Sequence, residues 1–507
     1  MKKYKITLFL AILAFVGCSD LEENPVGILA PESFFKTTED LQAVVNGSLA
    51  GITTESYWGR KLTLTLLLRG DLADIGDQGT SGRRVEVNNF TMGDDNGMVS
   101  SFWPQSYAII GTANQAISNS GLIDDDVEKV NAVVAQAYFV RAFTYFHLVR
   151  LFGDIPYIDF AVSDAAEIDE ISKTPESEVY EGIISDLEFA KEWLPDTQVA
   201  RSLPSKATAA AYLASVYLTR SDFQKAAEEA QFVINNESKF DLVLEPNFQD
   251  LFNSDKTGGL KEPLFTIDYV GQTRVGSYGQ DYVASVTGIR GDATHDYGEG
   301  WSVAVPSLKV YQDWDGRDYR KAVSLDTTAT SNEGVVYPYT EFEAYSDLAV
   351  NRPHIAKYYR NAGLAGNNGR ESSNNYIPMR YAEVLLIAAE ALNEINPGSN
   401  EAVSYVNRLR ARARNRAGTP STYPMDIAGG LSQDDLRDVI INERITELAF
   451  EFKRWYDIKR LNIGNEAFGT SGLEPQPNFD ANRDYLLPLP GPELVRNPNL
   501  QPNNPGY

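Results

Sequence analysis

Apolar residues recur at spacings of three and four along two long stretches of the chain, which is the period of a helix with one buried face. The first stretch predicts a long helix over 127–151 and a second from about residue 177 to residue 194. It ends in a pair of shorter helices at 205–219 and 222–235, where alanines on both members let the two backbones approach closely. Such a pair is typical of a tetratricopeptide-like helical hairpin.

The same pattern returns in the C-terminal part of the chain. Residues 379–395 and 400–415 predict another helical pair around an Asn-Pro-Gly turn, and 432–460 predicts one further helix. No single pair can bury its own apolar face, so we expect the pairs to stack into one superhelical scaffold. This scaffold should lie mainly in 127–235 and 379–460.

The segment between the two stretches, about 240–375, has a different pattern. It is rich in Gly, Asn and Tyr and contains short alternating runs such as LFTIDY at 264–269, which indicate short strands joined by long loops. Long loops on a rigid scaffold commonly hold binding residues. The predicted fold is therefore mostly α, with a tetratricopeptide-like helical-pair scaffold, few short strands and a loop-rich ligand-binding face.

The N-terminus has the pattern of a cleavable signal. Three lysines in residues 1–5 precede an apolar run at 6–16, which is too short to span a bilayer because a membrane helix needs about 20 residues. Gly17 and Cys18 close this run and resemble a bacterial lipobox, whose cysteine is lipidated. We predict a lipoprotein signal peptide at 1–17 and a lipidated Cys18. An ordinary secretory signal with a chance cysteine is the alternative.

Residues 18–26 are predicted to form an acidic tether. The run SDLEE at 19–23 resembles the signal by which Bacteroidetes export lipoproteins to the outer face of the outer membrane, and a plain solvated tether explains it equally well. Acyl chains contribute about 0.8 kcal/mol per buried CH₂, so an acylated Cys18 with more than one chain would hold the protein at outer-membrane lipid.

Composition excludes several other classes of protein. Cys18 is the only cysteine among 507 residues, so the chain can form neither an internal disulfide nor a Cys-rich zinc site or iron–sulfur cluster. The formal charge of −25 argues against a nucleic-acid partner, because phosphate contacts need clustered Lys and Arg. A hydrophobic fraction of 43%, with 11% aromatic residues, excludes general disorder.

A series of short motifs runs through almost the whole mature chain. They are FFKT at 34–37, FWP at 102–104, ANQAI at 113–117, AYFVRA at 137–142, FGDIP at 152–156, RYAEVLL at 380–386, NRLR at 407–410, RWYDIKR at 454–460, LLPLP at 486–490 and NPGY at 504–507. In this order, and together with the lipobox, they resemble the SusD/RagB family of outer-membrane nutrient-binding lipoproteins of Bacteroidetes.

The resemblance implies both a fold and a function. The fold is a single SusD-like domain over 27–507, with about four tetratricopeptide-like units supporting variable loops. The function is capture of a nutrient, usually an oligosaccharide, at the cell surface and its delivery to a SusC-like TonB-dependent outer-membrane transporter. Tethering through lipid would raise the effective concentration of the binding protein at that transporter.

Sugar binding needs a flat aromatic face against the ring and planar polar groups that bond the hydroxyls. Four of the six tryptophans lie in contexts typical of structural residues: Trp103, Trp193, Trp314 and Trp455. Trp58 and Trp301 lie in loops beside Gly and charged residues, so we expect these two rings to stack on the ligand.

Polar and aromatic neighbours in the same loops complete the predicted site. Beside Trp58 the candidate is Tyr57, and the family resemblance implies further ligand contacts from the acidic stretch that follows, at Asp71, Asp74 and Asp77. Beside Trp301, in the loop 276–300, they are Tyr278, Tyr282, Arg290, His295 and Tyr297. A rim loop at 361–375 could add Asn367 or Arg370.

Charged residues within the helices are expected to be structural. Arg141, Arg380, Glu383 and Glu390 lie among apolar positions, so they should pair or cap inside the scaffold, since buried charges are kept when paired. The alternating arginines at 408–416 spread round a helix, which favours a solvated, salt-bridged helix.

Catalytic and metal-binding patterns find little support. The histidines lack the spacing of metal ligands, and neither a phosphate-binding GxxxxGK[ST] nor a GxSxG motif occurs. We therefore expect no enzyme activity, no metal and no cofactor. Three alternatives to glycan binding stay open: the same fold binding peptides or another nutrient, a lipid-anchored glycan hydrolase, and a helical interaction scaffold with no small ligand.

Overall fold

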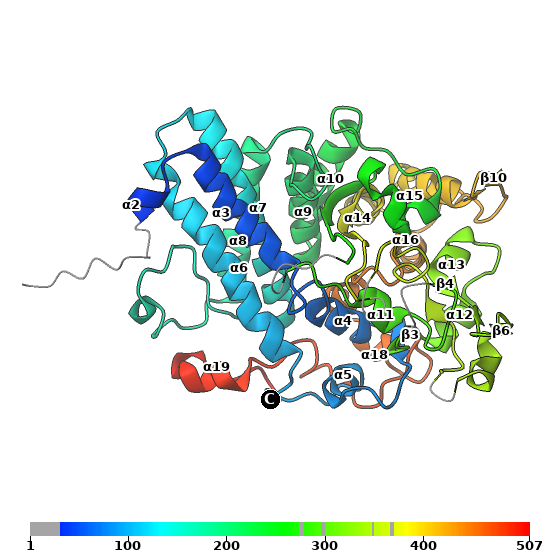
Figure 1. The fold of residues 1–507 in the computed structure, drawn as a ribbon. Coiled ribbons are helices and arrows are strands. Elements are labelled where there is room, and N and C mark those ends of the chain that lie inside the picture. The colour runs from blue at the N-terminus through cyan, green and yellow to red at the C-terminus, as the bar shows by residue number, and fades with distance from the viewer. Residues whose placement is uncertain (1–30, 273–277, 296–299, 347–348, 366–369) are drawn as a thin grey trace, which may run out of the picture.

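The computed structural model describes residues 31–507 except 273–277, 296–299, 347–348 and 366–369. Within these residues, long helices form one side of the molecule, and short strands, short helices and loops form the other (Figure 1). The long helices are α3 (Thr38–Ile52), α6 (Val99–Asn119), α7 (Val127–Phe152), α8 (Glu176–Trp193), α9 (Lys206–Thr219), α10 (Phe223–Asn235), α14 (Tyr381–Ile395), α15 (Asn400–Ala413) and α16 (Gln433–Glu447).

These helices stack in sequence into a continuous scaffold. Among the described residues the helical pairs are α3 with α6, α7 with α8, α9 with α10, and α14 with α15, and each pair also packs against the next. Figure 1 shows the row from α3, α6, α7 and α8 on the left, through α9 and α10, to α14, α15 and α16. The prediction of a mostly helical fold with about four tetratricopeptide-like pairs is confirmed, because each pair covers the apolar face of its neighbour.

Shorter elements connect the scaffold to the loop-rich side. The short α-helices are α2 (Pro31–Phe34), α4 (Lys61–Leu68), α5 (Gly82–Asn88), α11 (Val283–Thr287), α12 (Leu308–Asp313), α13 (Tyr319–Ser324), α17 (Arg454–Arg460), α18 (Gly464–Ala467) and α19 (Gly491–Arg496). The strands form two-stranded antiparallel sheets: β1 (Ala73–Ile75) with β3 (Ala304–Pro306), β2 (Pro263–Ile267) with β8 (Tyr376–Arg380), β4 (Leu325–Asp326) with β7 (His354–Ile355), β5 (Thr328–Thr330) with β6 (Val336–Pro338), and β9 (Asn415–Arg416) with β10 (Thr419–Pro420).

Local signals set the ends of several helices. The side chain of Asp126 caps α7 by accepting the N–H of Glu128, and the helix ends at Gly153, whose φ of 72° suits glycine. Ser205 caps α9 in a capping box with Thr208. Helix α7 is long and apolar enough to cross a membrane, but 78% of its most apolar window is buried within the protein, as in a core helix.

Two helix predictions in the C-terminal part need correction. The segment 379–395 starts as a strand, because β8 pairs with β2 as far as Arg380 before α14 begins. The single helix expected over 432–460 is two helices, α16 and α17, with an irregular link at 448–453. Phe450 and Phe452 adopt positive φ angles of 63° and 64° there, a conformation that a continuous helix cannot contain.

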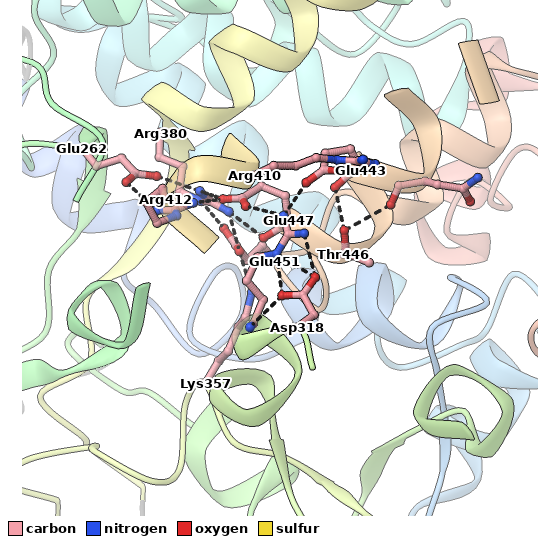
Figure 2. A network of polar contacts seen from close by, with 12 residues as sticks. Glu262, Asp318, Lys357, Arg380, Arg410, Arg412, Glu443, Thr446, Glu447 and Glu451 are labelled. Carbon is pink, nitrogen blue, oxygen red and sulfur yellow. Dashed lines mark hydrogen bonds and ion pairs between the residues drawn. The ribbon is translucent and has the colours of Figure 1, made fainter. Parts of the chain in front are cut away.

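Glu451, in the link at 448–453, belongs to a buried network of ion pairs (Figure 2). Arg380 is its centre, and its guanidinium bonds the carboxylates of Glu262 at 2.7 Å, Glu447 at 2.7 Å and Glu451 at 2.8 Å. Burial alone would raise the pKa of Glu447, but the positive charges of Arg412, Arg380 and Arg320 hold that pKa far below its usual range.

The expected pairing of buried charges is confirmed throughout the scaffold. Arg141 pairs with Asp186 at 2.7 Å, Glu383 with Lys453 at 2.8 Å, and Glu390 with Arg460.

The solvated helix expected at 408–416 needs correction at Arg412, which is buried and bonds Glu262 and Glu447 in the network of Figure 2. Packing of α15 against α14 and α16 buries that side chain, a tertiary effect that helical spacing does not reveal.

Candidate functional site

Trp58 and Tyr57 lie in the hydrophobic core, so the prediction that Trp58 stacks on a ligand is wrong. Trp58 is 2% exposed and Tyr57 0%. The indole of Trp58 packs on Phe143 of α7, with ring centroids 6.1 Å apart, and on Phe452 at 5.7 Å. Helix α7 and the link at 448–453 therefore cover the loop that the sequence suggested was open.

The second predicted loop does bring two of its aromatic residues together. Tyr282, just before α11, and Trp301, just before β3, have ring centroids 5.9 Å apart in an edge-to-face arrangement, and both side chains are half-buried. The backbone N–H of Trp301 donates to the carbonyl of Ser285 at 2.7 Å, which fastens the loop to α11. We call Tyr282 and Trp301 the ring pair.

Two guanidinium groups lie next to the ring pair. Arg60 lies over the Tyr282 ring, 4.2 Å from its centroid. Arg370, one of the two rim-loop candidates, is 5.9 Å from the Tyr282 centroid and 5.8 Å from that of Trp301. Arg60, Arg370 and the ring pair come from three distant parts of the chain. The structure therefore brings both guanidinium groups to Tyr282, and one of them also to Trp301.

Arg290 and Asp77 form an ion pair beside Trp301. The Arg290 guanidinium donates to Asp77 Oδ2 at 2.8 Å and to the Trp301 carbonyl at 3.0 Å. The N–H of Asp77 donates to the carbonyl of Ser302 at 2.7 Å. Two residues predicted from different loops thus meet at the backbone of Trp301.

Buried polar residues position these loops. Ser302 Oγ accepts the N–H of Arg290 at 2.9 Å and lies 2.7 Å from His354 Nε2, while His354 Nδ1 lies 2.9 Å from the Arg352 carbonyl. Burial lowers the pKa of His354 to about 3, so the imidazole is neutral. A neutral imidazole that donates from Nδ1 and accepts from Ser302 satisfies all of these contacts.

Asp281 links the ring pair to the rim loop. Its carboxylate accepts hydrogen bonds from Ser372 and Tyr376 and from the N–H of Val283, and its carbonyl accepts the N–H of Glu371 at 2.8 Å. Burial raises the pKa of Asp281 to about 6. These bonds hold the segment next to Arg370 against the segment that presents Tyr282.

Other candidates have structural roles or lie elsewhere. Asp71 is buried and paired with Arg454 at 2.7 Å. Asp74 lies in β1 opposite Val305 and accepts a hydrogen bond from Asn88 at 3.0 Å. Both carboxylates therefore support the fold next to the site.

Two members of the loop 276–300 have surroundings other than the ring pair. His295 packs edge-to-face on Tyr359 at 4.6 Å and lines a separate cavity of about 470 Å³. Tyr278 is 44% exposed. Tyr297, Asn367 and Cys18 lie outside the described residues.

Sequence reasoning missed a group of cations that includes Arg60, the residue lying over the Tyr282 ring. Besides Arg60, it includes Lys61 at the start of α4 and Arg83 and Arg84 in α5. Helix α4 packs against α5, so the four side chains come from neighbouring elements. Burial, and then the charges of Arg60, Arg83 and Arg84, lower the pKa of Lys61 to about 8. The signal available in the sequence was the adjacent pair Arg83-Arg84, close to the acidic candidates at 71–77.

The arrangement favours binding over chemistry. In the described part of the chain, no group of three or more His, Cys, Asp or Glu side chains is placed to hold a metal ion. The residues around the ring pair instead offer what recognition of a sugar needs, namely apolar ring faces with planar hydrogen-bonding groups beside them.

Comparison with known proteins identifies the family. The profile of the SusD family matches residues 343–507, and a profile described as starch-binding associating with outer membrane matches residues 70–218. A SusD-like protein of Formosa agariphila is 82% identical over 507 residues, which is 100% of both chains. This chain belongs to the SusD family.

More distant SusD relatives agree over the full length. A second SusD-like protein of Formosa agariphila is 27% identical over 99% of this chain and 98% of its own. The crystal structure of a SusD homolog from Bacteroides thetaiotaomicron matches with a TM-score of 0.81, at 21% identity over 94% of this chain and 98% of that one. A laminarin-binding SusD-like protein matches with a TM-score of 0.76, at 22% identity over 93% and 100%. These two structures confirm the fold.

Membership of the SusD family also bears on function. The family consists of carbohydrate-binding proteins and not of enzymes, so the expectation of a non-catalytic protein is confirmed. The starch-binding profile associates its members with the outer membrane.

Proposed function

We propose that this SusD-family protein captures an oligosaccharide at the cell surface, with the ring pair as its stacking platform. The observation that carries the proposal is the meeting of Tyr282 and Trp301 with Arg60, Arg290 and Asp77 in one half-buried group. Stacking on a ring contributes ~1 kcal/mol, so the affinity should lie in the micromolar to millimolar range. Such an affinity permits fast release.

The same proposal includes the route of the captured sugar. Residues 1–17 would be removed as a signal peptide, Cys18 would carry the lipid anchor, residues 18–26 would form the tether and 27–507 the binding domain. The anchored protein would then hand its ligand to a SusC-like TonB-dependent transporter. Family membership and the outer-membrane association of the matching profile support this route.

Calorimetry with the ring-pair variants tests the proposal. Trp301→Ala and Tyr282→Ala should each weaken binding of an oligosaccharide found by screening a broad glycan panel, by about five- to tenfold, because each removes one aromatic face. Trp193→Ala, which removes a partly buried indole from α8, is the matched control and should leave affinity unchanged.

Two results would contradict the proposal. One is unchanged glycan affinity in both ring-pair variants. The other is binding to a peptide library with no binding to the glycan panel.

A further inference from the structure

We propose that the glycan bound at the ring pair is acidic, with carboxylate or sulfate groups that the neighbouring cations bind. This inference rests on the proposed function and adds the class of ligand. It is carried by an excess of cations at one place on a protein whose formal charge is −25. We call Arg60, Lys61, Arg83 and Arg84 the cationic cluster.

The cationic cluster has too few carboxylates for its charge. The single carboxylate of Glu55 forms ion pairs with two residues of the cluster, Arg60 and, at 3.7 Å, Lys61. Within the described residues, Arg83 and Arg84 have no carboxylate within ion-pair distance, and the Nε atoms of both are buried without a hydrogen-bond partner. The neighbouring pair of Asp77 and Arg290 is balanced and adds no net negative charge.

Burial and like charges act together on the pKa values of the cationic cluster. Burial, followed by the charges of Arg60 and Arg83, lowers the pKa of Arg84 to about 10. Burial and then Arg60 lower that of Lys61 to about 8. A bound anion would relieve this repulsion.

The ion network of Figure 2 is a cluster of buried charges with a structural role, and its arginines can be compared with the cationic cluster by their number of carboxylate partners. There Arg380, Arg412 and Arg320 each bond at least two carboxylates. A buried charge without such partners is costly unless a ligand provides them. The contrast between the two places favours a binding role for the cationic cluster.

The cationic cluster is also continuous with the ring pair. Arg60 belongs to both, because its guanidinium lies over the Tyr282 ring and it is the N-cap residue of α4, which packs against the helix α5 that carries Arg83 and Arg84. Arg370 adds a guanidinium within 6 Å of both rings at the rim. A sugar stacked on Tyr282 or Trp301 would thus place its acidic substituents near planar guanidinium groups, whose geometry matches carboxylate and sulfate.

Calorimetry with three probes tests the inference. Oligogalacturonate carries carboxylates only, carrageenan oligosaccharides carry sulfates only, and laminarin oligosaccharides are neutral. We expect at least one acidic probe to bind more tightly than laminarin, with an affinity that falls as salt is added. The acidic probe that binds more tightly shows whether the site prefers carboxylate or sulfate groups.

Two variants of opposite sign make the test specific. Arg60→Gln should weaken binding of the acidic probe about tenfold or more, whereas Glu55→Gln, which removes the competing carboxylate, should strengthen it severalfold. Glu55→Gln should change the affinity for a neutral glycan by no more than about twofold. Arg496→Gln, in an exposed pair on α19, is the charge control and should have no effect.

The failures of the two proposals are distinguishable. Laminarin binding as tightly as both acidic probes, lost in Trp301→Ala, would overturn the acidic-ligand inference and leave the proposed function standing. Unchanged acidic-probe affinity in Arg60→Gln, or weaker affinity in Glu55→Gln, would also overturn the inference. Binding of none of the three probes overturns the inference as well, while the broad panel decides the proposed function.

Discussion

At the scale of single residues, two tryptophans with similar sequence contexts have different surroundings in the folded protein. Trp58 and Trp301 both follow a tyrosine closely and lie beside glycine and charge. Trp58 is packed between α7 and the link at 448–453, whereas Trp301 stays half-buried next to Tyr282. One ring therefore stabilises the fold, and the other is the one that we propose stacks on a ligand.

Trp58→Ala should destabilise the protein without altering its ligand affinity. Removing a fully packed indole costs about 3–5 kcal/mol in lost burial and cavity formation. We expect urea denaturation to show this loss in the free energy of unfolding. Calorimetry on the folded fraction should show the wild-type affinity. Wild-type stability together with lost glycan binding would contradict the assignment of Trp58 to the core.

His354 gives a second residue-scale prediction, based on its lowered pKa. Near pH 6.5 the imidazole takes up a proton in the unfolded chain, whereas in the folded protein its pKa is about 3. The unfolded state therefore binds more protons between these values, and stability falls as the pH is lowered. Integrated from pH 7 to pH 5, this single group costs ~2 kcal/mol.

Comparison with His354→Gln isolates that effect. Asp281 and Glu474, whose pKa values burial raises to about 6 and about 7, act in the opposite direction, so the wild-type curve alone is a mixture. The stability lost between pH 7 and pH 5, measured by urea denaturation, should be smaller in the variant by ~2 kcal/mol. Equal losses in both proteins would show that the imidazole protonates in the folded state.

At the scale of elements, buried ion pairs tie the helical scaffold to the loop-rich side. Arg380 ends β8 directly before α14 begins. Its carboxylate partners come from before β2, from the end of α16 and from the link that follows α16. These elements are far apart in the sequence. The ion network therefore fixes where the strands and loops sit relative to the helices.

Arg380→Met should lower the free energy of unfolding by ~3–5 kcal/mol. The side chain keeps a similar length but leaves Glu262, Glu447 and Glu451 with one cation fewer in a buried place. Arg496→Met, in an exposed pair with Glu493, is the control and should change stability by less than ~1 kcal/mol. A loss in Arg380→Met no larger than in the control would mean that the network reorganises without cost.

At the scale of the whole molecule, the residues of the proposed binding site gather where loops and short helices from distant segments meet. Tyr282, Trp301, Arg60 and Arg370 come from three such segments, and the β1–β3 pair and α11 hold them together. The stacked helices contribute rigidity and leave the loops free to differ in chemistry. A family with one scaffold can serve many ligands in this way.

Cys18→Ala tests the attachment of the whole molecule to a membrane. If Cys18 carries acyl chains, the variant should lose labelling by radioactive palmitate and should leave the membrane fraction for the soluble fraction, because the anchor is gone. Ser19→Ala, the neighbouring substitution, is the control and should behave as the wild type. A Cys18→Ala protein that remains in membranes would contradict lipid anchoring.

The sequence by itself determined the helical scaffold and the family. Helical periodicity, helix caps and the order of short motifs are local properties, and they are readable without knowing which segments meet. The helices α7, α8, α9 and α10 accordingly start and end within two residues of their predicted limits.

Only the tertiary structure decided which rings and charges are available to a ligand. Burial of Trp58 depends on Phe143 and Phe452, and the surplus charge of Arg83 and Arg84 depends on which carboxylates reach them. Both are properties of contacts between segments far apart in the chain. Local pattern carries no information on such contacts, because the same loop sequence can be covered or left open by what packs against it.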